Sequence, residues 1–216
     1  MKRIDMIKRE VNEEAEKRAR EERQKTRENA QLKIFFMIIG IVIVVVLATM
    51  FIVNQTKHFE QDGVTFNVVK EIAPYQTSLP VIYEGKNASY NFYLRNDPRK
   101  LTEEISFDGE INLEVPMNQM VINITGEVDC NKDSGIAVGN LVSLYRISGI
   151  SVIKDENATC DNNGRYLFLQ IEPGNETRIE QTSGACYTLY VNNCEILKGT
   201  ERFMVETFEQ IHKDWL

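Results

Sequence analysis

The sequence predicts an extracytoplasmic α/β or α+β domain with a mixed sheet, preceded by a long charged helix that continues into one transmembrane helix. Three observations lead to this prediction. A run without charge or proline, residues 34–53, separates a basic stretch from an acidic one. The part after this run combines β-type segments with helical patterns. All four cysteines of the chain lie in that part.

The apolar run "IFFMIIGIVIVVVLATMFIV" is twenty residues long. A helix rises about 1.5 Å per residue, so the run spans roughly 30 Å, the thickness of a bilayer's hydrocarbon core. A cleaved signal peptide is the alternative, because the segment 46–48 offers a cleavage site. Yet 33 residues precede the run and apolar residues continue past that site. These features favour an uncleaved signal anchor.

The charge distribution gives the anchor a direction. Residues 1–33 carry eleven Lys/Arg and eight Asp/Glu, a net charge of +3, and the remaining residues carry fourteen and twenty-four, a net charge of −10. Positive charge collects on the cytoplasmic side of membrane spans. We therefore expect a single-pass protein of the cell membrane with a cytoplasmic N-terminus and an outer C-terminal domain. The acidity of the outer part disfavours nucleic acid as a partner.

Residues 1–33 read as a cytoplasmic helix of mixed charge, because acid-first pairs four residues apart recur and no glycine or proline interrupts them. A solvated helix is the favoured interpretation. A coiled coil, a cytoplasmic partner site and a helix lying on anionic lipid are the alternatives. Residues 54–63 are predicted to be a juxtamembrane linker, and residues 64–216 the disulfide-containing outer domain.

The first half of the outer domain has the pattern of antiparallel strands. The β-type runs are rich in Val, Tyr and Phe and end at Gly, Asn or Pro. Asp97-Pro98 indicates a turn, and Asp108-Gly109 indicates a tight hairpin turn. The expected strands are 64–72, 79–85 and 89–95, followed by a turn at 96–101 and a hairpin over 104–115.

The second half predicts strands with helices packed on them. Apolar residues at helical spacing indicate helices over 134–148, with Ser134 as N-cap, and over 195–216. Segment 119–125 followed by a helix and by 150–153 forms a strand–helix–strand unit. The remaining expected strands are 165–172, 186–191 and an edge strand at 176–182.

The loop "GEVDCNKDSG", residues 126–135, joins the first strand of this unit to its helix. A helix N-terminus offers free N–H groups to anions. The loop nevertheless matches neither phosphate-binding glycine motif, and Asp129 and Asp133 would repel a phosphate. A plain strand-to-helix connection is the favoured interpretation. No cofactor motif is present elsewhere, so we expect no cofactor.

If the expected strands 119–125 and 150–153 are parallel neighbours, the loops that follow them meet at one edge of the sheet. Acidic residues gather at that edge. Carboxylate oxygens suit Ca²⁺, although the spacing does not match the EF-hand pattern. A solvated acidic edge is the favoured interpretation, with calcium as the alternative. The weak calcium candidates are Asp129, Asp133, Asp155 and Asp161.

An even number of cysteines in an outer domain predicts disulfides. The same parallel pairing would bring Cys130 near Cys160, so we expect that bridge. Cys186 and Cys194 then pair by elimination, provided that the chain bends between them. Other pairings with Cys130 or Cys160 stay open.

Five Asn-x-Ser/Thr sequons occur after residue 53 and none occurs in residues 1–33. Asn54 lies very close to the predicted span, and Asn123 lies inside a predicted strand. The candidates for glycosylation are therefore Asn87, Asn157 and Asn175.

Histidine-based catalysis is disfavoured, because the two histidines, His58 and His212, lie outside any core motif. The predicted function is accordingly non-enzymatic binding or scaffolding at the cell surface, with the lipid bilayer and a protein as partners. The alternative is a membrane-anchored hydrolase or calcium-dependent module that uses the acids at the 129–133/155–161 edge. A third interpretation places the function in the N-terminal helix.

Three stretches, "NFYLRNDPRKL", "IKDENATCDNNGRYLFLQIEPGNETRIEQ" and "CEILKGTERFMVETF", resemble uncharacterised single-pass membrane proteins of small-genome archaea. The resemblance covers the span and most of the outer domain. It implies a location in the cell membrane and is compatible with glycans at the sequons, and it implies no activity.

Overall fold

The computed structural model describes residues 36–50, 57–70, 73–83, 85–128 and 133–215. The chain divides into two compact units, Met1–Gln55 and Thr56–Leu216, which are described separately. The predicted cytoplasmic helix, residues 1–33, lies outside the described residues.

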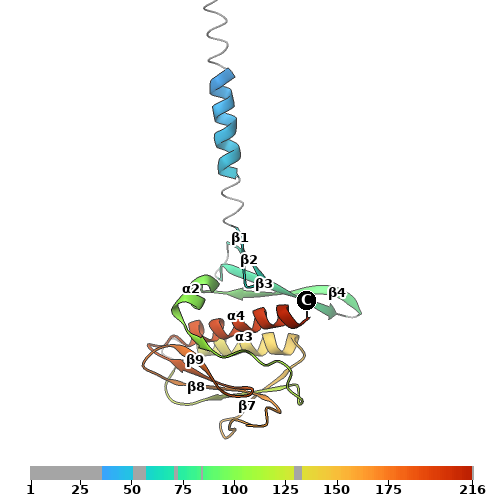
Figure 1. Cartoon of the computed structure of the whole chain (residues 1–216), viewed down its shortest axis with the longest axis vertical. Helices are drawn as coiled ribbons and strands as arrows, with labels where there is room; N and C mark the ends of the chain where they lie inside the picture. The colour runs from blue at the N-terminus through green and yellow to red at the C-terminus, as the bar shows by residue number, and fades with distance from the viewer. Residues whose placement is uncertain (1–35, 51–56, 71–72, 84, 129–132, 216) are drawn as a thin grey trace, which may run out of the picture. The chain divides into compact units, whose positions relative to one another are not determined.

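In the first unit, residues 36–50 form a helix (Figure 1). All its large apolar side chains are exposed, from 39% at Ile39 to 67% at Met50. The two ends of the predicted span, residues 34–35 and 51–53, lie outside the described residues. Within the described part of the chain, no helix is both long enough and apolar enough to cross a membrane.

The second unit begins with a four-stranded antiparallel sheet whose strands follow one another in chain order. A tight turn joins the first two strands, and its residues Asp62 and Gly63 both have positive φ, 47° and 85°. Asp-Gly suits such a turn because glycine adopts this conformation at little cost. The first strand lies within the predicted linker. The strands are β1 (His58–Gln61), β2 (Val64–Val68), β3 (Tyr75–Tyr83) and β4 (Lys86–Leu94).

The other sheet has six strands in the order β5-β9-β10-β8-β6-β7. All its neighbouring strands are parallel except β9 and β10, which are antiparallel. The unit is therefore α+β with one mixed and one antiparallel sheet, which agrees with the predicted mixed sheet. The strands are β5 (Phe107–Asp108), β6 (Gln119–Ile124), β7 (Ser151–Lys154), β8 (Leu167–Pro173), β9 (Arg178–Ser183) and β10 (Cys186–Val191).

The strand–helix–strand unit is confirmed, because β6 and β7 are parallel neighbours with Gln119 opposite Ser151. The helix between them, α3 (Ser134–Ile147), has Asp133 rather than Ser134 at its N-cap position, so that detail of the prediction is wrong. The long C-terminal helix α4 (Ile196–Trp215) also forms as expected. Segment 178–183 is not an edge strand, since β9 lies between β5 and β10.

Two predicted turns take other forms. The stretch after β4 contains the short helix α2 (Pro98–Glu104), because the Asp97 carboxylate accepts a hydrogen bond from Arg99 N (3.1 Å) and proline is favoured at the first helical position. The hairpin expected over 104–115 does not form. Its first strand is only β5, which pairs in parallel with β9 instead of with the residues that follow Gly109.

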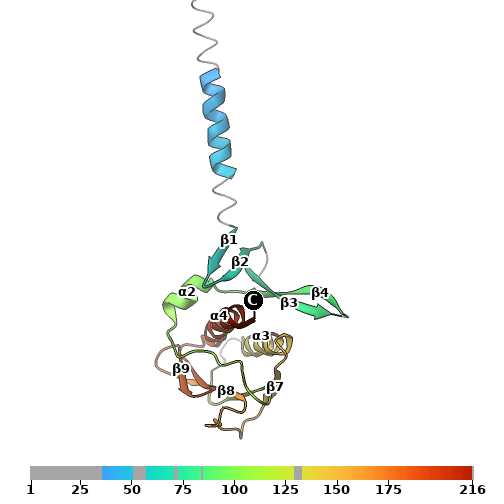
Figure 2. The same ribbon diagram turned by 45° about the vertical axis from the view of Figure 1, so that its right-hand side comes forward.

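Helices α3 and α4 lie in a layer between the two sheets (Figures 1 and 2). The side of α4 facing the six-stranded sheet carries Phe203, whose ring lies 5.5 Å from that of Tyr187. Toward the four-stranded sheet, the rings of Phe208 and Phe92 lie 5.3 Å apart. At the start of the helix, a Cβ on Gly199 would come within 2.6 Å of Leu189. One helix therefore carries the cores of both sheets, and a glycine allows its close approach to β10.

Glu201 connects this helix to the chain that leaves the four-stranded sheet. Its carboxylate is fully buried and accepts three hydrogen bonds. Two come from the backbone N–H groups of Arg95 (2.7 Å) and Asn96 (2.9 Å), and one from the Asn96 side-chain amide (2.7 Å). Burial raises the pKa of Glu201, and the hydrogen bonds oppose this rise. The carboxylate thereby fixes the bend between β4 and α2 to the central helix.

We predict that Glu201→Ala lowers the free energy of unfolding by about 2–4 kcal/mol, because it leaves three partly buried donors without their acceptor. Urea unfolding followed by circular dichroism measures this loss. Glu103→Ala, on an exposed position of α2, is the matched control and should change stability by less than about 0.5 kcal/mol. Equal, small losses for both variants would contradict the role given to Glu201.

Candidate functional site

The loop between β7 and β8 covers part of the outer face of the six-stranded sheet, opposite the helices. Under it lies a small apolar cluster formed by Val121, Phe168 and Cys186, with Ala158 and Tyr166 packed against it. The buried Asn123 of β6 donates hydrogen bonds from its side chain to the carbonyl oxygens of Glu156 (3.3 Å) and Ala158 (3.1 Å). An asparagine in a central strand therefore positions this loop.

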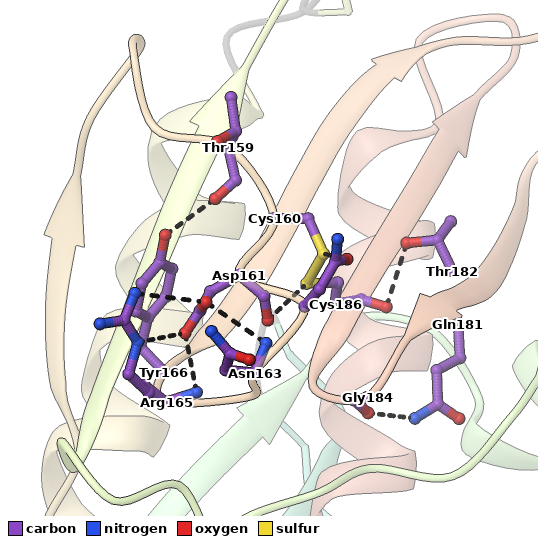
Figure 3. Close-up of a disulfide and its surroundings, with 11 residues drawn as sticks. Thr159, Cys160, Asp161, Asn163, Arg165, Tyr166, Gln181, Thr182, Gly184 and Cys186 are labelled. Atoms are coloured by element: carbon purple, nitrogen blue, oxygen red, sulfur yellow. Dashed lines mark hydrogen bonds and ion pairs between the residues drawn. A yellow bond between two sulfur atoms is a disulfide. The ribbon is translucent and has the colours of Figure 1, made fainter.

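A disulfide fastens the same loop to the first residue of β10 (Figure 3). It joins Cys160 to Cys186, whose Cα atoms lie 5.7 Å apart. The predicted Cys130–Cys160 bridge and the predicted Cys186–Cys194 bridge are therefore both wrong. The reason is topological: β10 lies beside β8, so its start comes close to the loop that precedes β8. Cys194 is also disulfide-bonded, and Cys130 lies outside the described residues.

Asp161 forms an ion pair next to the disulfide. Its Oδ2 lies 2.8 Å from Arg165 Nε and 3.0 Å from Arg165 N, and its Oδ1 accepts from Asn163 N at 3.3 Å (Figure 3). The hydrogen bonds from Arg165 lower the pKa of Asp161 to about 2. Tyr166 donates its hydroxyl to the Thr159 carbonyl at 2.8 Å. These contacts hold the loop in a closed turn and occupy the carboxylate oxygens.

The structure shows where the predicted acidic edge lies. Parallel pairing of β6 and β7 does send both loops to one edge of the sheet, as expected. Asp133 lies 3.7 Å from Arg95, and Asp155 accepts from Asn157 N at 2.9 Å. Among the described residues, no three His, Cys, Asp or Glu side chains come together around a possible metal position. Asp129 lies outside the described residues.

The glycosylation candidates Asn87, Asn157 and Asn175 are exposed. Asn123 is 6% exposed, so its side chain cannot carry a glycan in the folded protein. In the Asn175 sequon, the Thr177 hydroxyl is buried and donates to Glu195 Oε2 at 2.8 Å. Asn54 lies outside the described residues. Asn87 and Asn157 are consequently the candidates whose surroundings are most open.

Two surface pockets lie away from the predicted edge. One, of about 570 Å³, is lined by the segment 109–114 and by Gln181, Gly184, Gln210 and Asp214. The other, of about 590 Å³, lies between α2, the 176–177 turn and the start of α4. In the second pocket, the one ammonium group among its lining residues, Lys198, lies 2.9 Å from Glu195 and 3.7 Å from Glu104. Both pockets are rich in carboxylates, so their chemistry suits cationic or hydroxyl-bearing groups.

Tyr187 supports the wall of the first pocket. Its buried hydroxyl donates to the Glu110 carbonyl (2.7 Å) and accepts from Asn112 N (2.8 Å). Burial raises its pKa to about 12, so the hydroxyl keeps its proton and does not act as a base near neutral pH. The hairpin prediction for 104–115 missed this wall, because a side chain from a distant strand supplies its hydrogen bonds.

Glu209 is a second acidic side chain on the buried side of α4. It is 5% exposed, and its Oε1 has no hydrogen-bond partner among the described residues. Burial, followed by the nearby charges of Glu206 and Asp62, raises its pKa to about 7, while Arg202 and Lys213 oppose this rise. Asp62 belongs to the β1–β2 turn, whose Gly63 packs closely against His212. The carboxyl group thus lies where this turn meets the helix.

Sequence reasoning did not single out Glu201 or Glu209, although one signal was present. Glu201 stands four residues from Leu197 and from Val205, on the apolar face of the predicted helix. A charge on that face predicts a buried, partnered group. The two histidines carry no such arrangement: His58 Nδ1 contacts Asn67 Oδ1, and His212 packs against the turn.

Comparison with known proteins gives no assignment, since no family model, no curated protein and no solved structure matches the chain. The geometry of the described residues therefore carries the functional argument alone.

We predict that stability depends on pH through Glu209. A raised pKa means that the folded protein binds the proton more tightly than the unfolded chain, so this contribution is complete below about pH 4.5 and is lost as pH rises through about 7. Glu209→Gln removes this titration. Relative to the variant, wild type should lose about 2–3 kcal/mol between these limits, since one pKa unit corresponds to about 1.4 kcal/mol.

Urea unfolding at a series of pH values between 4 and 8.5 measures this difference. Glu103→Gln, an exchange at an exposed carboxylate, should give a curve parallel to wild type. If the Glu209→Gln curve is also parallel to wild type, Glu209 does not titrate in this range.

Proposed function

We propose that this chain is a single-pass membrane protein whose folded unit, residues 56–216, acts at the cell surface by non-enzymatic binding or scaffolding. The observation that carries the proposal is the helix 36–50, which bears large apolar side chains on all sides and leaves them exposed. A helix that is apolar all round requires apolar surroundings, and a bilayer supplies them.

The location outside the cell is supported by the cysteines and the sequons. Disulfides persist in oxidising compartments, and Cys160, Cys186 and Cys194 are disulfide-bonded. The exposed sequons at Asn87, Asn157 and Asn175 lie in the same folded unit. The excess of Lys/Arg in residues 1–33 orients the N-terminus to the cytoplasm.

The preference for binding over catalysis rests on how the acidic side chains are used. Glu201 accepts three hydrogen bonds, Asp161 pairs with Arg165, and Asp133 lies near Arg95. Carboxylates whose oxygens are held by such partners stabilise the folded structure rather than act as catalytic acids or bases. The acidic surface pockets offer contact sites for a partner that carries positive or hydroxyl groups.

We predict that the full chain stays in the membrane fraction after alkaline carbonate extraction and is released by detergent. Ile43→Arg with Val46→Arg should move the protein to the soluble fraction, because each charge at the centre of a span costs about 2.5–3.5 kcal/mol. The same exchange at the exposed Ser78 and Glu103 is the control and should leave the protein in the membrane. Release of unaltered protein by carbonate would contradict the anchor.

A second prediction separates the scaffold from the calcium-dependent alternative. The melting temperature of the full chain in detergent should not change between Ca²⁺ and EDTA, whereas a ligand at one hundred times its Kd adds about 2.7 kcal/mol. Asp133→Asn with Asp155→Asn should behave likewise. Asp161→Asn, which breaks the pair with Arg165, should lower the melting temperature equally in both conditions. A rise with Ca²⁺ that the double variant abolishes would instead favour the calcium module.

A further inference from the structure

The hairpin of β3 and β4 has an end that the helices do not cover. The strand β4 is the last strand of the four-stranded sheet, and its residues Lys86 to Asn91 are all exposed. Only Phe92 and Leu94, at its other end, are buried. In both views the end of the hairpin extends past the helical layer (Figures 1 and 2). Among the described residues, no strand other than β3 pairs with β4, so its outer edge is unpaired there.

The two outer edges of this hairpin differ. On β3, only Tyr75 and Gln76 pair with β2, and the free part of that edge carries Pro80. Proline blocks strand addition because it has no N–H group. The β4 edge carries no proline, and its register with β3 continues without a bulge from Lys86 to Leu94. Its single charge is Lys86. Of the two edges, β4 has the weaker protection against pairing.

The charge of this region points to a second copy of the chain as the occupant. Residues 34–216 carry twenty-four acids, yet residues 73–96 carry only Glu84, together with Lys86 and Arg95. Two acidic domains repel each other over most of their surface. The β3–β4 hairpin is a region where they can meet without opposing carboxylates.

The side-chain pattern of β4 fits its own copy. Phe92 and Leu94 of β4 face the core and form an inner apolar stripe. Tyr90 lies on the same face of the strand, with its ring 4.8 Å from that of Phe92, and remains 40% exposed. In an antiparallel pair related by a two-fold axis, the free end of each β4 lies beside the buried end of the other. Ala88 and Tyr90 of one copy would then lie against the inner apolar stripe of the other copy, and their side chains would become buried.

We propose that two copies of this chain associate through antiparallel pairing of their β4 strands, which joins the two four-stranded sheets into one. Backbone hydrogen bonds supply the contact, and the inner stripe supplies apolar area at its centre. This proposal concerns self-association and does not depend on the membrane proposal.

The test uses the full chain in mild detergent. Sedimentation equilibrium measures dimerisation, and hydrogen exchange followed by mass spectrometry measures protection of β4 amides as a function of protein concentration. Wild type should dimerise, and the amides of 86–94 should become more protected as the dimer forms. All variants are compared in an Asn87→Gln background, because Ser89 completes the Asn87 sequon. In this background, Ser89→Lys with Asn91→Lys places four lysines on the exposed face of the paired strands and should raise the dissociation constant of the dimer about tenfold or more.

The matched control is Gln76→Lys with Ser78→Lys. Ser78 lies opposite Asn91 on the same face of the same sheet, but β3 is not the pairing strand. The dissociation constant of the control dimer should stay within about twofold of the wild-type value, since exposed charges away from the contact act weakly. Both variants should keep the melting temperature of the wild-type monomer. A monomer at all concentrations, equal weakening by both pairs of lysines, or a dimer without protection at β4 would overturn the proposal.

Discussion

The rest of the folded unit depends on how one buried carboxylate, Glu201, fixes the central helix to the chain between β4 and α2. Its hydrogen bonds to Arg95 N and Asn96 N hold that bend while the same helix packs Phe208 against Phe92 and Phe203 against Tyr187. A helix between two sheets could slide along its own axis if only apolar contacts held it. Directed hydrogen bonds to a desolvated charge remove that freedom.

The acidic side chains of this protein take different roles because their surroundings differ. Asp161 sits beside Arg165 and has a lowered pKa, so it remains a charged acceptor that holds a surface loop. Glu209 is buried near other acids and has a raised pKa, so it becomes sensitive to pH near neutrality. An acidic composition alone therefore says little about where a site lies, and the partners of each carboxylate decide it.

The predictions from sequence succeeded where the pattern was local. Periodicity located α3, β10 and α4, and parallel pairing of β6 with β7 followed from the strand–helix–strand order. The predictions failed where contacts between residues distant in the sequence determine the local structure or the disulfide pairing. Asp97-Pro98 starts a helix because Asp97 caps it and the helix packs on α4, and the Cys160–Cys186 bond requires β10 beside β8. Among the candidate acids, Asp161 and Arg165 stand four residues apart, so the sequence already allowed their ion pair. The approach of Arg95 to Asp133 depends on tertiary packing that no spacing reveals.

The position of β10 constrains when the unit can form. This strand lies inside the six-stranded sheet, between β9 and β8, and α4 follows it at the end of the folded unit. Residues 186–215 are made after strands β1 to β9, so until then β8 lacks its neighbour β10 and both sheets lack α4. Assembly from the N-terminal end during synthesis is therefore blocked. The Cys160–Cys186 disulfide joins this late strand to a loop that is made earlier.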